Sequence, residues 1–100
     1  MKGLSKQRIA TAIARYAPIN GIRSAYLFGS HARGDADEHS DVDLCIEADE
    51  GFTLFALGGF GKRMEDDLGC PVDIVCGENA FYPKARERYQ RDKVLLYAQS

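Results

Sequence analysis

Two aspartates, Asp41 and Asp43, stand one residue apart in a stretch that otherwise has the pattern of a buried strand. Residues i and i+2 of a strand share one face and lie about 6.5–7 Å apart, so both carboxylates can reach a single site. Buried carboxylates without a positive partner destabilise a fold or stay protonated. Arg33 could be that partner, through an ion pair. Mg²⁺ is favoured instead, because it binds hard oxygen ligands and takes the others from water and substrate phosphates.

Gly29 and Ser30 precede Asp41 by ten intervening residues and fit the same chemistry. A glycine lets a ligand approach the backbone closely, and the Ser30 hydroxyl adds a donor. A short helix that starts at Ser30 also directs free N–H groups toward an anion. Two Mg²⁺ ions about 3.5–4 Å apart would stabilise the attacking and leaving oxygens of a displacement at phosphorus. The pattern therefore predicts a site for a metal–triphosphate complex.

Asp73 is a third carboxylate, in an apolar segment that reads as a neighbouring strand. We expect it to complete the coordination of one metal ion or to accept the proton of an attacking hydroxyl. The alternative is an ordinary ion pair at a strand end, with Arg63 or a lysine.

The elements that must position these residues follow from periodicity and from turn residues. Helices are predicted over residues 5–17, 52–68 and 83–97, a single helical turn over 30–33, and strands over 22–28, 41–48 and 71–76. Gly58, Gly59 and Gly61 each weaken the second long helix by up to about 1 kcal/mol relative to alanine, so we expect a distortion or a broken start there. Its apolar stripe is predicted to include Phe55. Strands alternating with helices indicate an α/β layer.

The composition bounds the class of protein. One hundred residues, 45% hydrophobic and 28% charged, predict one globular domain over residues 1–100. A net charge of −2 gives no overall attraction to nucleic acid or to anionic membranes, so direct binding to either is not expected. Three cysteines without CxxC spacing exclude a disulfide framework or zinc ribbon, and we expect a reducing, cytoplasmic setting. Basic residues concentrate between Lys84 and Lys93, as a solvated helix face or as a surface for phosphate or a partner.

The spacing of Gly29-Ser30 and Asp41-Val42-Asp43 resembles the signature of the DNA polymerase β-like nucleotidyltransferase superfamily. The longer string GSHARGDADEHSDVDL is similar to the minimal nucleotidyltransferase (MNT) branch, and the likeness covers residues 22–76. The resemblance implies the nucleotidyltransferase fold, an α/β (α+β) arrangement in which helices pack on a small mixed β-sheet. By position, it implies that Gly29, Ser30 and Arg33 contact the nucleotide. It also implies that the catalytic, metal-binding carboxylates are Asp41, Asp43 and Asp73.

The resemblance also implies a reaction. It is the Mg²⁺-dependent transfer of AMP from ATP to a hydroxyl, expected to be a tyrosine of a HEPN toxin, which would make this chain an antitoxin. The acceptor site would come from another chain, either the toxin or a second copy in a homo-oligomer. One alternative is an interaction protein that neutralises a toxin by binding alone. Another is nucleotidyl transfer to a small molecule such as an aminoglycoside. A polymerase is disfavoured by the negative charge and the lack of a template-binding domain.

Overall fold

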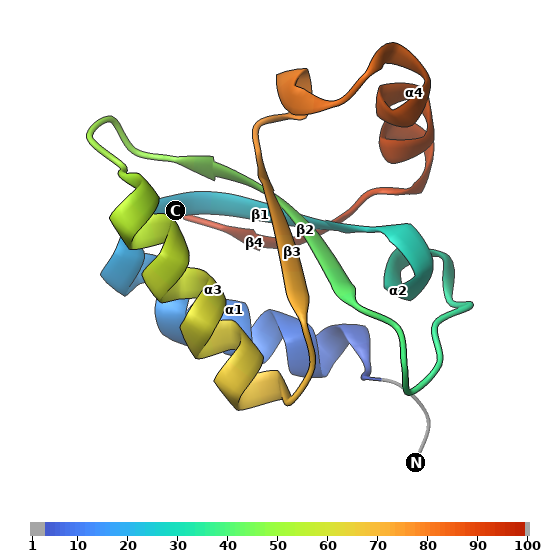
Figure 1. Ribbon diagram of the computed structural model, residues 1–100, viewed down its shortest axis with the longest axis horizontal. Helices are drawn as coiled ribbons and strands as arrows, with labels where there is room; N and C mark the ends of the chain where they lie inside the picture. Colours follow the sequence, from blue (N-terminus) through green and yellow to red (C-terminus); the bar gives the residue numbers. More distant parts are fainter. Residues whose placement is uncertain (1–3, 100) are drawn as a thin grey trace.

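The computed structural model describes residues 4–99. Within them, four α-helices alternate along the chain with the four strands of one sheet. The elements are α1 (Lys6–Asn20), β1 (Ile22–Phe28), α2 (Gly29–Arg33), β2 (Val42–Ala48), α3 (Leu54–Leu68), β3 (Val72–Cys76), a 3₁₀ turn η1 (Glu78–Ala80), α4 (Pro83–Asp92) and β4 (Val94–Ala98). Figure 1 shows α1 and α3 beside one another along one side of the sheet, and α4 apart from both. None of the helices in the described part of the chain is long and apolar enough to cross a membrane.

The sheet has the strand order β3-β2-β1-β4 and is mixed. β1 pairs in antiparallel fashion with both β2 and β4, whereas β2 and β3 run parallel. Parallel neighbours need a crossover connection, and α3 provides it. The predicted α/β arrangement, a small mixed sheet with helices packed on it, is confirmed.

The hydrophobic core lies between one face of the sheet and the pair α1 and α3. It consists of side chains from α1, from the sheet and from α3, namely Ile9, Ala12, Ile13, Ala17, Ile22, Ala25, Leu27, Val42, Leu44, Ile46, Phe60, Met64, Leu68 and Val72. Asp67 of α3 forms ion pairs with Arg8 and Arg15 of α1, which join the two helices at the edge of this core.

The expected distortion of α3 is wrong, because the helix is continuous from Leu54 to Leu68. Thr53 caps its first turn by accepting a hydrogen bond from the Ala56 amide at 3.1 Å. Packing of one face of α3 against the core offsets the loss of helix stability that the glycines cause. Phe55 does not belong to that face: it is 93% exposed, because it stands five positions before Phe60, which rotates it about 140° away.

The helix predicted over residues 83–97 is wrong beyond Asp92. Lys93 has extended dihedral angles, φ −62° and ψ 144°, and Val94–Ala98 forms the fourth strand. This segment is rich in β-branched, leucine and aromatic side chains. It pairs with the free edge of β1, with Leu27 opposite Val94 and Ala25 opposite Tyr97.

Candidate active site

Asp43 and Asp73 lie directly opposite one another on adjacent parallel strands, β2 and β3. Opposed residues on neighbouring strands are about 4.8 Å apart and share a face of the sheet. The neighbours of Asp43 in the strand, Val42 and Leu44, are fully buried in the core, so alternation places Asp43 on the face away from α1 and α3. Asp41 comes immediately before β2. The strand register thus brings together the carboxylates that the sequence only suggested as partners.

The electrostatics of Asp43 show that the other two acids act on its carboxyl group. Partial burial, followed by the carboxylates of Asp73 and Asp41, raises the pKa of Asp43 above its ordinary value. His31 and Arg33 act in the opposite direction, with smaller effects on that pKa. A carboxylate in this position gains from a nearby cation, so the donor set suits a hard divalent ion that also takes oxygens from phosphate. Within residues 4–99, however, no group of three His, Cys, Asp or Glu side chains is close enough to hold a metal ion unaided.

Gly29 lies against the Asp43 carboxylate, where α2 begins. A Cβ added at Gly29 would stand 3.2 Å from Asp43 Cγ and would overlap Asp43 Oδ2. The residue also has a φ of +74°, a conformation that costs other residues about 1–2 kcal/mol. Both requirements make glycine necessary here, and they allow a ligand to approach the backbone beside the acids.

The predicted helical turn is present as α2, but its side chains differ in part from expectation. Arg33 pairs with Asp35 at 3.2 Å and with Asp92 at 3.8 Å, so the ion-pair alternative, in which it neutralises Asp41 and Asp43, is not the arrangement found. The alternative for Asp73 is not found either: within residues 4–99 it forms no ion pair with Arg63 or with a lysine, and Lys62 pairs with Asp66.

His31 is a residue of this site that the sequence reasoning missed. It is only 6% exposed, and its Nε2 has no hydrogen-bond partner within the described residues. The sequence offered no signal for its burial, because the residue stands in a polar segment that reads as a loop apart from one helical turn.

Helix α4 packs over the same face of the sheet through aromatic side chains. Phe28 of β1 meets Phe81 edge-to-face at 5.2 Å and Tyr89 at 5.5 Å between ring centroids. Tyr89 is 4% exposed, and the Lys93 ammonium lies 4.9 Å from the ring centroid of Tyr26. These contacts fix α4 next to α2, so a helix from the C-terminal quarter of the chain becomes a wall of the site.

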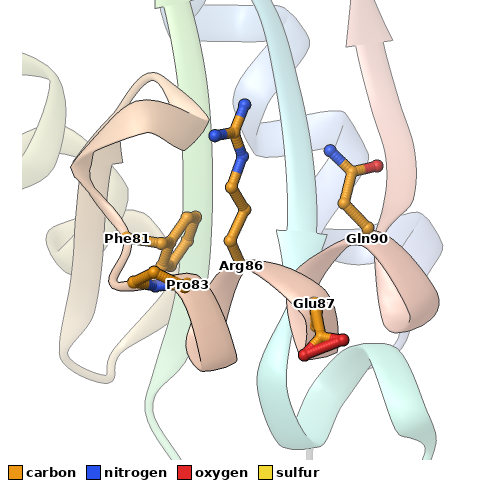
Figure 2. Close-up of a pocket in the computed structure, with 5 residues that line it drawn as sticks. All are labelled: Phe81, Pro83, Arg86, Glu87 and Gln90. Atoms are coloured by element: carbon orange, nitrogen blue, oxygen red, sulfur yellow. The ribbon is translucent and has the colours of Figure 1, made fainter.

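Two hollows adjoin α4. The α2–α4 cavity has a volume of 190 Å³ and is lined by Phe28, Gly29, Arg33, Phe81, Ala85, Arg88, Tyr89 and Asp92. The outer hollow is larger, at 470 Å³, and is lined by Phe81, Pro83, Arg86, Glu87 and Gln90 (Figure 2). Only the first of them shares a wall, Gly29, with the acids.

Comparison with known proteins agrees with this geometry. Residues 6–99 match the nucleotidyltransferase domain family. A Methanocaldococcus jannaschii protein with the provisional name protein adenylyltransferase MJ0435 is 33% identical over 75 residues, which are 75% of this chain and 80% of that protein. Protein adenylyltransferase MntA of Thermococcus cleftensis is 38% identical over 55 residues, 55% of this chain and 56% of its own.

Solved structures give the same result for the fold. A provisionally assigned minimal nucleotidyltransferase superposes with a TM-score of 0.75 at 32% identity, covering 91% of this chain and 95% of its own. A toxin–antitoxin complex with AMP-PNP contains a chain that superposes with a TM-score of 0.71 at 20% identity, covering 97% of this chain and 76% of its own. With a glycine-bounded turn, opposed carboxylates and a match over residues 6–99, the chain belongs to the nucleotidyltransferase domain family, in its minimal nucleotidyltransferase branch, and is an enzyme of that class.

Proposed function

We propose that this protein transfers AMP from ATP to a tyrosine hydroxyl of a HEPN toxin and thereby acts as the antitoxin. The observation that carries the proposal is the placement of Asp43, opposite Asp73 and against Gly29. The relatives named protein adenylyltransferase support the AMP transfer. A structure described as a tri-AMPylated Shewanella oneidensis HEPN toxin with its MNT antitoxin shares the fold at a TM-score of 0.67, and it supports the choice of partner.

In this mechanism the acceptor hydroxyl attacks the α-phosphorus of ATP, and pyrophosphate leaves. Asp41, Asp43 and Asp73 would hold Mg²⁺, with two ions in the complete site, and these ions would stabilise the charge on the attacking and leaving oxygens. Gly29 and Ser30 would bind the β- and γ-phosphates. Asp73 would either complete the coordination or accept the proton from the attacking hydroxyl.

The setting follows from the chemistry. ATP as donor requires a compartment that supplies it, so we place the protein in the cytoplasm. Residues 1–100 would form one catalytic domain, and the toxin would bring the acceptor. Arg33 would contact phosphate once its ion pairs with Asp35 and Asp92 open.

Transfer of label from α-phosphate-labelled ATP to a purified cognate HEPN toxin tests the proposal. With Mg²⁺ present, wild-type protein should label the toxin. The Asp43→Asn variant should lose about 10³-fold in rate, because a neutral amide cannot hold the cations that stabilise the transition state. Asp49→Asn is the matched control, since Asp49 is 49% exposed, pairs with Arg23 and follows the other end of β2. Full activity of Asp43→Asn, with Asp49→Asn also active, would contradict the mechanism.

Neutralisation by binding alone is the second candidate. It is favoured by the lack of three ready metal ligands within residues 4–99. If it is correct, Asp41→Asn protects toxin-expressing cells as well as wild type does. The purified protein should then inhibit the purified toxin equally with and without Mg²⁺ and ATP. The enzymatic proposal expects protection to fail in that variant and inhibition to require both compounds.

A further inference from the structure

The α2–α4 cavity adjoins the carboxylate site at Gly29. Gly29 lines this cavity and also lies against the Asp43 carboxylate. Two arginines, Arg33 and Arg88, line the same space. Pockets that enclose a whole small ligand measure about 300–1,000 Å³, so a volume of 190 Å³ suits one part of a ligand. Gly29 thus adjoins both the Asp43 carboxylate and a cavity with two arginines, a charge arrangement that suits the anionic tail of a metal-bound ligand.

The basic residues of α4 are not equivalent. Arg86 binds Glu78 at 2.8 Å, and Arg91 binds Asp92 at 3.0 Å. Within residues 4–99, Arg88 has no carboxylate within 4.0 Å, although it lines the α2–α4 cavity. Its charge is therefore not neutralised by the protein that surrounds it.

Helix geometry separates the side of α4 whose polar side chains bind Glu78 from the side that carries Arg88. The residues of α4 that line the outer hollow precede those that line the α2–α4 cavity by two positions each, which corresponds to a rotation of about 200°. Figure 2 shows Arg86 and Gln90 projecting on the same side of α4, and Glu78 accepts hydrogen bonds from both, at 2.8 and 2.7 Å. That side is tied to η1, whereas Arg88 belongs to the side that meets Gly29.

Asp92 is the one acid among the cavity residues, and its charge is already balanced. Arg91 donates two hydrogen bonds to it, at 3.0 and 3.3 Å, and these lower the pKa of its carboxyl group. With Asp92 neutralised in this way and Arg33 paired with Asp35, the charge of Arg88 leaves the cavity positive.

We propose that Arg88 binds the terminal phosphates of the nucleotide, together with Arg33 and across the α2–α4 cavity. The inference rests on the proposed nucleotidyl transfer and adds a substrate-binding residue from α4 to it. A guanidinium group binds phosphate oxygens through two parallel hydrogen bonds, which fix the orientation of the phosphate as well as its position. Arg88 then holds the leaving pyrophosphate in line while the α-phosphate lies at the carboxylates.

Calorimetric titration of inorganic pyrophosphate, in the presence of Mg²⁺, tests this role independently of activity. Arg88→Ala should weaken binding about 10- to 100-fold, as expected for the loss of a charged hydrogen-bond donor. Arg88→Lys should give a smaller loss, because the charge remains and the paired geometry does not. Lys84→Ala, which removes one positive charge from the same helix outside the cavity, should change binding less than twofold. Unchanged circular dichroism shows that each variant is folded.

The outcomes separate this inference from the proposed function. Equal pyrophosphate binding by wild type and Arg88→Ala, or no binding by wild type, overturns the role of Arg88, and AMP transfer by wild type would leave the proposed function intact. A changed preference between ATP and GTP with unaltered pyrophosphate binding also overturns it, since Arg88 would then contact the base. Pyrophosphate binding that depends on Arg88, without AMP transfer to the toxin, overturns the proposed acceptor and supports the phosphate site.

Discussion

The backbone of Gly29 lies so close to the Asp43 carboxylate that a side chain added there would overlap it. Strand β1 delivers its last residue, Phe28, opposite Asp43 in the antiparallel register, and the chain must turn at once to avoid the carboxylate. The positive φ of Gly29 makes this turn. Backbone geometry and the position of the acid are therefore fixed by the same residue.

Gly29→Ala should reduce both stability and AMP transfer. The left-handed backbone alone costs about 1–2 kcal/mol, and the added methyl group must in addition displace Asp43. Gly34→Ala is the matched control, because Gly34 has a φ of +87° but nothing within 4 Å of an added Cβ. Urea denaturation should show a loss in both variants, whereas the labelling assay should fall at least tenfold only in Gly29→Ala. Equal activity of the two variants would mean that the contact with Asp43 is unimportant.

Asp43 should destabilise the protein at neutral pH when no cation is bound. Its pKa is raised in the folded state, so ionisation is easier in the unfolded chain, and stability is lost as the pH rises through the raised pKa. Asp43→Asn should therefore be more stable than wild type at pH 7. The difference should vanish below the ordinary aspartate pKa of about 3.9, where both states are protonated. Urea titrations at several pH values in EDTA measure this, and a less stable Asp43→Asn at pH 7 would contradict it.

Helix α3 shows how an element can form against its own composition. Three glycines lie in its first eight residues, yet the helix is continuous because Phe60, Met64 and Leu68 bury one face. An added Cβ on Gly61 would meet Ile74 Cδ1 at 3.5 Å, an ordinary packing distance. The glycines are thus compatible with the helix without being required by its packing.

Gly58→Ala should stabilise the protein by about 0.5–1 kcal/mol, because alanine lowers the conformational entropy of the unfolded chain. Gly58 is exposed, and nothing lies within 4 Å of an added Cβ. Gly69→Ala provides the contrast: Gly69 ends the same helix with a φ of +75°, so alanine there should destabilise. Chemical denaturation of both variants measures the two signs, and a destabilised Gly58→Ala would show that this part of α3 is strained.

For the molecule as a whole, residue patterns predicted the individual helices and strands better than they predicted which of these elements pack or pair with one another. The order Gly29-Ser30, Asp41 and Asp43 was sufficient to predict the fold, because that spacing resembles a family signature that reflects a strand, a turn and a second strand. The roles of these residues at the site stay predictions. The register of Asp43 with Asp73 was not predictable, since pairing depends on which strands become neighbours. Strand β4 was missed because the charged, helical pattern of α4 leads into it without a glycine or proline. The basic segment between Lys84 and Lys93 was noted as a solvated face or a surface for phosphate or a partner, but the cavity beneath α4 and the place of Arg88 in it depend on how α4 docks.

The position of β1 between β2 and β4 has a consequence for how the enzyme is made. During synthesis the chain can form the β1–β2 pair before residues 94–98 exist, but the other edge of β1 finds its partner only once β4 has been made. Such long-range pairing is slow because a large loop must close first. Since α4 directly precedes β4, its docking beside α2 should follow the β1–β2 pairing. A ribosome-bound chain that lacks Val94–Ala98 would therefore form the turn at Gly29 before it gained the α4 wall of the α2–α4 cavity, and that cavity should close only after β4 has been made.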